Sequence, residues 1–139
     1  MKITAAKYTS TDPDAIETAA AFGSLTVQSA GAQTFSAWLS TMSNNRAGYT
    51  VSMSATAMKG TTTELANAYS NYTVTVNGAS ITTDNTTSSP EPVVVISVSD
   101  LSQLSVESNE ISLSVDRATF NSAVAGSYSG TVTFTFSAI

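Results

Sequence analysis

The chain has 139 residues, of which 42% are apolar and only 11% are charged, with a formal net charge of −5. This length suits one domain, residues 1–139, with a single substantial core. Five basic residues are scattered along the chain: Lys2, Lys7, Arg46, Lys59 and Arg117. Because phosphate neutralisation needs a basic patch, we expect no nucleic-acid partner.

The chain contains no His and no Cys. Their absence excludes Ser/His/Asp catalysis, thiol nucleophiles, most transition-metal sites and any disulfide framework. Asp12 with Asp14, and Glu107 with Glu110, are the nearest carboxylate pairs, but helix-start charge and a solvated turn explain them better. We predict no enzyme activity, and we assign no catalytic, cofactor-binding or metal-binding residue.

The first predicted element is a short helix in "STDPDAIETAAAF". Thr11 or Asp12 can cap it, Pro13 fits its first position, and Gly23 can end it. The stretches "SLTV" (24–27) and "TFSAWLS" (34–40) follow as predicted strands. Trp38, the only tryptophan, is favoured there as a core or inter-sheet anchor over a sugar-stacking platform.

Strict alternation marks the middle of the chain. In "GYTVSMSATAM" one face carries Tyr49, Val51, Met53, Ala55 and Ala57, the pattern of a strand buried on one side. "TTTELANAYS" indicates a second short helix, with Thr61 and Glu64 as a capping box. Residues 72–76 and 79–82 then form a predicted hairpin, because Asn77-Gly78 supplies a type I′ turn.

The loop "TTDNTTSSPEP" comes next. Asp84 and Asn85 lack the full ligand spacing of a calcium loop, and the acceptor patterns for N-glycosylation at Asn71 and Asn85 are too short to carry weight. "VVVISV" suits a strand buried on both faces. "LSQLSV" and "EISLSV" are two further predicted strands, with turn residues Ser108 and Asn109 between them. About eight short strands favour a sandwich or barrel.

The last fifteen residues, "AGSYSGTVTFTFSAI", contain the longest unbroken alternation of apolar and polar residues in the chain. One face carries Gly130, Val132, Phe134, Phe136 and Ala138, and the other carries Thr131, Thr133, Thr135 and Ser137. Such a strand lacks the Lys and Pro residues that blunt free edges. We therefore expect strands on both sides of it, one of which can belong to another chain.

This ending resembles the closing strand "AGxYxGxVxhxh" (h for apolar) of bacterial chaperone/usher fimbrial subunits and of the related spore-coat-U-like secreted pilins. Ala125, Gly126, Tyr128, Gly130 and the apolar positions 132, 134 and 136 carry the resemblance. It implies an immunoglobulin-like β-sandwich that lacks one strand. The implied subunit-interaction groove is lined by Tyr128, Gly130, Val132, Phe134 and Phe136.

The resemblance also implies partners. A periplasmic chaperone, and then a strand from another copy or a related subunit, fills the groove by β-strand addition, with an usher in assembly. The implied product is an extracellular surface filament, with a host receptor as a further expected partner. The start "MKITAAKYTS" is a poor donor strand, and it lacks the apolar region of a signal peptide.

Two other functions stay open. One is a viral or phage structural protein, such as a capsid, decoration or tail component, for which Met1 is a natural start. The other is a secreted carbohydrate-binding module with Trp38 in its platform, a hypothesis that rests on fold analogy alone. No apolar run is long enough for a membrane span.

Overall fold

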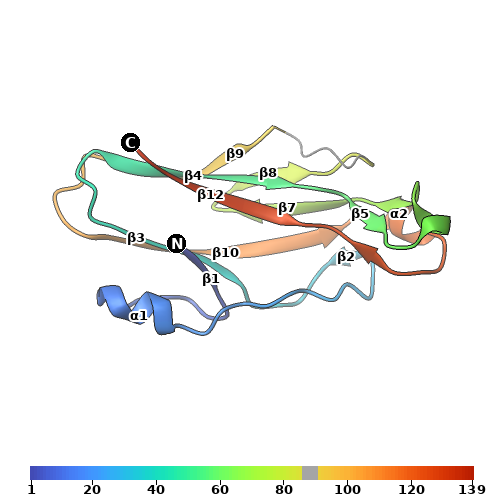
Figure 1. Cartoon of the computed structure of the whole chain (residues 1–139), viewed down its shortest axis with the longest axis horizontal. Coiled ribbons are helices and arrows are strands. Elements are labelled where there is room, and N and C mark those ends of the chain that lie inside the picture. Colours follow the sequence, from blue (N-terminus) through green and yellow to red (C-terminus); the bar gives the residue numbers. More distant parts are fainter. Residues whose placement is uncertain (86–90) are drawn as a thin grey trace.

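The computed structural model describes residues 1–85 and 91–139. Strands hold 46% of the chain and helices 11%. The strands form antiparallel sheets that pack face to face, with short helices at the periphery (Figure 1). The predicted all-β sandwich with one or two short helices is therefore confirmed.

The larger sheet has the strand order β1-β3-β10-β7-β8, and β2 pairs with the end of β10. Its strands are β1 (Lys2–Thr4), β2 (Gly31–Ala32), β3 (Trp38–Ser43), β7 (Tyr72–Val76), β8 (Ala79–Thr82) and β10 (Ser105–Val115). The N-terminal strand β1 lies at one edge of this sheet, where it pairs with β3.

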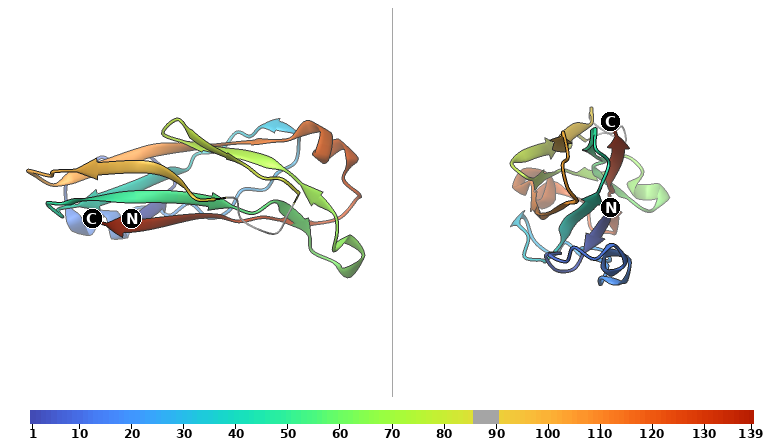
Figure 2. Two further views of the ribbon diagram at one scale, coloured as in Figure 1. Left: turned by 90° about the horizontal axis from the view of Figure 1, so that it is seen from above. Right: turned by 90° about the vertical axis from the view of Figure 1, so that its left-hand side faces the viewer.

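The second sheet has the order β12-β4-β9. Its strands are β4 (Gly48–Ala55), β9 (Val93–Ser99) and β12 (Val132–Ala138). A small sheet of order β11-β5-β6 lies at one end, formed by β5 (Met58–Gly60), β6 (Tyr69–Ser70) and β11 (Tyr128–Ser129). Because β5 follows β4 and β11 precedes β12, the small sheet continues the second sheet (Figure 2).

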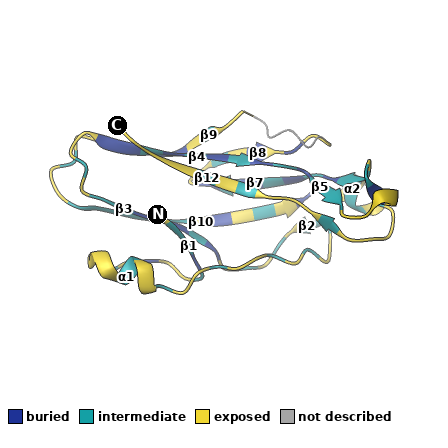
Figure 3. Ribbon diagram, viewed as in Figure 1, coloured by how far each residue is buried: buried dark blue, intermediate teal, exposed yellow. Residues whose placement is uncertain are grey.

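The core lies between the sheets, and strand β4 supplies its centre (Figure 3). The predicted alternation of β4 is confirmed, since Tyr49, Val51 and Met53 are fully buried while the residues between them are half-buried. The prediction for Trp38 is wrong, because Leu39 holds the core position on β3. Trp38 is only half-buried, and the Lys7 ammonium lies 5.8 Å from its ring centroid.

Helix α1 (Pro13–Thr18) begins as predicted: Asp12 caps it and accepts a 3.0 Å hydrogen bond from the backbone N–H of Asp14. The predicted end at Gly23 is wrong. The backbone turns extended after Thr18, where the Phe22 N–H donates to the Ile3 carbonyl and the Ala20 carbonyl accepts from Ala5. The backbone of residues 20–22 thus bonds to the free side of β1 and its continuation, and does not extend the helix.

The second predicted helix is only a 3₁₀ turn, η1 (Thr63–Leu65), whose N-cap is Thr62 and not Thr61. Helix α2 (Arg117–Ser122) was not predicted. Its N-cap is Asp116, whose carboxylate accepts a 2.8 Å hydrogen bond from the Thr119 N–H. This bond lowers the pKa of Asp116.

The hairpin of β7 and β8 is confirmed, with positive φ angles of 51° at Asn77 and 77° at Gly78. The prediction that "VVVISV" is buried on both faces is wrong, because β9 is an edge strand and Val94 is 54% exposed. The predicted turn at Ser108 and Asn109 is also wrong: both lie within the unbroken strand β10 and pair with β3. Residues 86–90 of the predicted loop 82–92, which include Thr86 and Thr87 of the second glycosylation pattern, lie outside the described residues.

Candidate functional site: an open strand edge beside an apolar groove

The outer edge of β12 is unpaired in the part of the chain that the structure describes, because β12 pairs only with β4. The Thr131 carbonyl accepts from the Thr56 N–H, and the Ile139 N–H donates to the Gly48 carbonyl. Odd-numbered residues therefore direct their backbone groups to β4. Backbone direction alternates along an antiparallel strand, so residues 132, 134, 136 and 138 direct their N–H and C=O groups to the open side.

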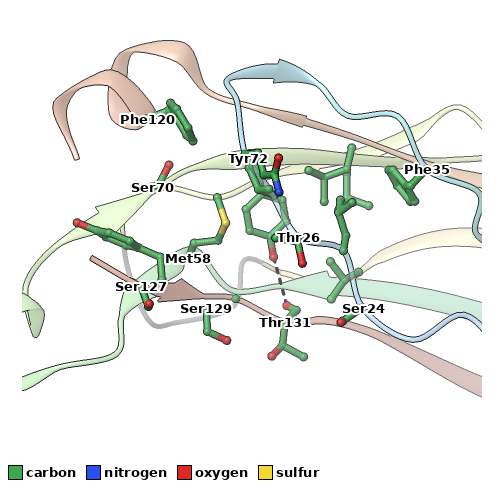
Figure 4. Close-up of a pocket in the computed structure, with 18 of the residues that line it drawn as sticks. Ser24, Thr26, Phe35, Met58, Ser70, Tyr72, Phe120, Ser127, Ser129 and Thr131 are labelled. Carbon is green, nitrogen blue, oxygen red and sulfur yellow. Dashed lines mark hydrogen bonds between the residues drawn. The ribbon is translucent and has the colours of Figure 1, made fainter. Parts of the chain in front are cut away.

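A groove of about 870 Å³ runs beside this edge. Its walls come from β11 and β12, from residues 22–28, from the interior faces of β7 and β10, and from the region of α2 (Figure 4). Ligand sites in proteins are commonly about 300–1,000 Å³. The groove is thus large enough for a peptide segment or for several of its side chains.

Four of the five predicted groove residues line this hollow: Tyr128, Gly130, Val132 and Phe134. Phe136 does not line it. Its ring stacks on the buried Tyr49 ring with a centroid distance of 5.0 Å, and 36% of the residue stays exposed. Phe136 nevertheless shares the parity of Val132 and Phe134, so its side chain lies on the same face of β12.

Sequence reasoning missed other parts of the groove lining. Phe35, Met58 and Phe120 contribute large side chains to it. Phe35 and Met58 lie within stretches that were predicted as strands, so their apolar character was visible but their meeting place was not. Phe120 lies on the unpredicted helix α2, for which Asp116 was the available N-cap signal.

Another wall of the groove is formed by residues 23–28, which we call the 23–28 segment. The prediction that residues 24–27 form a strand is wrong: the segment is extended but not in a sheet. Leu25 and Val27 are half-buried, while Ser24, Thr26 and Gln28 are exposed. The alternation expected of a strand is therefore present without a pairing partner.

The groove is electrically neutral, because none of the described residues that line it is charged. Tyr72 donates a 2.7 Å hydrogen bond from its hydroxyl to the Thr56 carbonyl, and burial raises the pKa of Tyr72 to about 12. Ser70 is 3% exposed, and its hydroxyl has no partner among the described residues. An uncharged occupant fits this lining better than a charged one, since burying an unpaired charge is costly.

A smaller hollow of about 290 Å³ lies where β1 approaches β12. Lys2 and Ile3 line one side, and Val132, Thr133 and Phe134 line the other. Ile3 and Phe134 also border the larger groove. Val132 and Phe134 therefore border both hollows, and the open edge of β12 lies beside a depression in the surface at these two residues.

The start of the chain is bound into its own domain. The Tyr8 N–H donates to the Ser108 hydroxyl at 3.0 Å, and Tyr8 is 8% exposed. Lys2 donates 2.6 Å hydrogen bonds from its ammonium to the carbonyls of Glu17 and Ala19. Residues 2–8 are thus occupied in this structure and are not a free strand.

No family model, curated protein or solved structure matches this chain. Among the described residues, no cluster of acidic side chains is suited to hold a metal ion, and no helix is long and apolar enough to cross a membrane.

Proposed function

We propose that this protein is a structural subunit of a bacterial surface filament, assembled by donor-strand exchange. The observation that carries the proposal is the open edge of β12 beside an uncharged, mostly apolar groove. In β-strand addition, backbone hydrogen bonds at an edge supply affinity, and alternate side chains in pockets supply specificity. The β12 edge and its groove offer both.

Without an occupant, this edge is a liability. Long apolar edges without Lys, Pro or bulges promote aggregation, and β12 contains none of these blunting residues. A donor strand would bond to residues 132, 134, 136 and 138 and would cover Phe136. Completion of the sheet therefore explains why a folded protein retains this edge.

The proposed donor comes from another chain, a second copy or a related subunit, because residues 2–8 are bound to β3 and β10 of their own domain. A periplasmic chaperone protecting the groove, an usher, an extracellular location and adhesion to a host receptor follow from the resemblance and belong to the same proposal. A viral or phage structural protein built by strand addition would use the same edge. The half-buried Trp38 beside Lys7 does not favour the carbohydrate-binding alternative.

The test uses a synthetic ten-residue peptide that alternates Val and Thr, added to the full chain. Amide hydrogen exchange measured by NMR should show protection at residues 132, 134 and 136. Phe134→Asp should abolish binding, because it places a carboxylate in the neutral groove. Thr135→Asp is the matched control, since its side chain is exposed on the other face of the same strand and lines neither hollow.

A peptide in which Lys replaces each Val should bind neither variant nor the wild type. Equal binding of the Val/Thr peptide to both Asp variants, each confirmed as folded by circular dichroism, would contradict the proposal. So would unchanged exchange along β12 at saturating peptide. Electron microscopy of the chain fused to a donor strand should show filaments that Phe134→Asp eliminates and Thr135→Asp preserves.

A further inference from the structure

Ser70 is the exception among the buried polar side chains. Five polar residues of the described chain are buried: Thr4, Ser40, Thr41, Ser70 and Thr83. The hydroxyls of the other four make hydrogen bonds of 2.7 to 3.1 Å within the chain. The Ser70 hydroxyl has no partner among the described residues. Because an unpaired hydroxyl is costly to bury, nearly all such groups in proteins are paired.

Ser70 is also the only one of these five residues that borders the groove. It ends strand β6, and it pairs with Met58 of β5 across the small sheet. Figure 4 shows Ser70 between Met58 and Phe120 of helix α2, and all three residues line the groove. The hydroxyl without a partner therefore lies in the wall of a hollow that has room for part of a second molecule.

The polar groups near Ser70 in its own chain bond elsewhere. The Asn71 N–H donates to the Thr119 hydroxyl of α2 at 3.0 Å. The Tyr72 hydroxyl donates to the Thr56 carbonyl at 2.7 Å. These bonds leave the Ser70 hydroxyl to a partner that comes from outside the chain.

We propose that Ser70 determines specificity within the groove. A strand that occupies the groove presents a Ser or Thr side chain to the Ser70 hydroxyl and apolar side chains at its other groove-facing positions. This inference rests on the proposed function. It adds one selective polar contact to a groove that otherwise selects for apolar character.

The chemistry of the groove favours a hydroxyl as the partner of Ser70. A hydroxyl both donates and accepts hydrogen bonds. None of the described residues that line the groove is charged, so a carboxylate or ammonium group would be buried there without a counter-charge. Hydroxyl pairs already join Thr4 to Ser40 and Thr41 to Tyr49 at 2.9 Å. A second chain of similar composition would supply the same kind of partner.

One polar pair also fixes the register of the bound strand. A strand that alternates apolar and polar residues presents the same face after a shift of two residues, so burial of apolar side chains alone distinguishes such registers poorly. A hydroxyl at one groove-facing position is paired with Ser70 in a single register and is buried unpaired in the others. A lone buried polar residue fixes the register of coiled coils for the same reason.

The experiment exchanges Val for Thr in the peptide, since both side chains are β-branched and Thr adds a hydroxyl. The Val/Thr peptide is made as a series in which each member carries Thr in place of one groove-facing Val. Isothermal titration with the full chain should show one member that binds at least fivefold more tightly than the rest. Ser70→Ala should bring that member within twofold of the others. Ser129→Ala is the matched control, because it removes an exposed hydroxyl from the same lining and should keep the preference.

A nitroxide at the N-terminus of each peptide reports the register, because it broadens the NMR signals of nearby β12 amides. Members whose Thr is displaced should either lose affinity or shift by two residues to reach Ser70. Affinities within twofold of one another in one common register would overturn the inference. So would a preference or a shift that persists in Ser70→Ala. Binding of the parent peptide would then leave the proposed function standing, whereas absence of binding by every peptide would reject both.

The free chain gives an independent check. Ser70→Ala removes a hydroxyl without a partner and should not lower the urea midpoint of unfolding. Thr41→Val removes a hydroxyl that lies 2.9 Å from the Tyr49 hydroxyl and should lower that midpoint. A lowered midpoint for Ser70→Ala would show that the hydroxyl already has a partner in the free chain, and the inference would be rejected.

Discussion

Replacement of Phe136 by Ala separates the stability of the free chain from strand binding. The Phe136 ring stacks on Tyr49 in the core, and 36% of the residue remains exposed, outside the groove but on the same face of β12 as Val132 and Phe134. The buried part contributes to folding of the isolated chain. The exposed part contributes only when a strand covers it.

The two effects can be estimated from area. A Phe buries about 200 Å² when fully covered, so the exposed 36% corresponds to about 70 Å². At about 25 cal/mol per Å², its burial by an incoming strand is worth about 1.8 kcal/mol, or about a 20-fold change in affinity. The remaining area of about 130 Å² predicts a loss of about 3 kcal/mol in the free energy of unfolding.

Urea denaturation measures the loss in the free energy of unfolding, and isothermal titration with the Val/Thr peptide measures the change in affinity. Thr135→Ala is the control, because Thr135 is exposed on the opposite face of β12 and should change stability by less than about 0.5 kcal/mol. A destabilised Phe136→Ala variant with unchanged peptide affinity would refute the reasoning. It would mean that the strand does not cover this face of β12.

Two further predictions concern the fold that supports the groove. Burial raises the pKa of Tyr72 from 10.0 to about 12, so above about pH 10 the unfolded chain loses the hydroxyl proton while the folded chain keeps it. In urea titrations between pH 10 and 12, the free energy of unfolding of the wild type should therefore fall more steeply with pH than that of Tyr72→Phe. Equal slopes would contradict this prediction. Gly48→Ala would place a Cβ 2.0 Å from the Val98 carbonyl oxygen at a φ of +106°, so thermal and urea melts should show a loss of more than about 3 kcal/mol. Gly23→Ala, which meets no atom within 4 Å, should stay within about 0.5 kcal/mol, and similar losses in both variants would exclude the clash as the cause.

Features of the fold that depend on local chemistry could be predicted from the sequence. The alternation of apolar and polar residues in β4 and β12 reflects burial of one face of each strand. The turn of the hairpin needs positive φ angles, which Asn77 and Gly78 adopt. The groove residues Tyr128, Gly130, Val132 and Phe134 were implied by the resemblance of the terminal stretch to pilin closing strands. The alternation of β12 places Val132 and Phe134 on one face of the strand.

Features that depend on distant partners could not be predicted. Ser108 has the composition of a turn residue, yet its hydroxyl accepts from the Tyr8 N–H and lies 3.0 Å from the Ser40 hydroxyl. These contacts join residues about 70 and 100 positions apart, so no local pattern contains them. The 23–28 segment is the reverse case, because its local pattern is that of a strand while no neighbouring strand pairs with it.

Two rows of unpaired backbone groups lie beside the groove. On the exposed face of the hairpin, even small hydroxyls find partners: Thr73 lies 2.8 Å from Thr82, and Thr75 lies 2.7 Å from Ser80. Along the open side of β12 and along the 23–28 segment, whole rows of backbone groups lack protein partners among the described residues. Both rows border one neutral groove, and each has strand-like alternation. Solvation of these rows would leave the apolar lining of the groove exposed to water, whereas a strand added to β12 would satisfy its open edge and cover part of that lining.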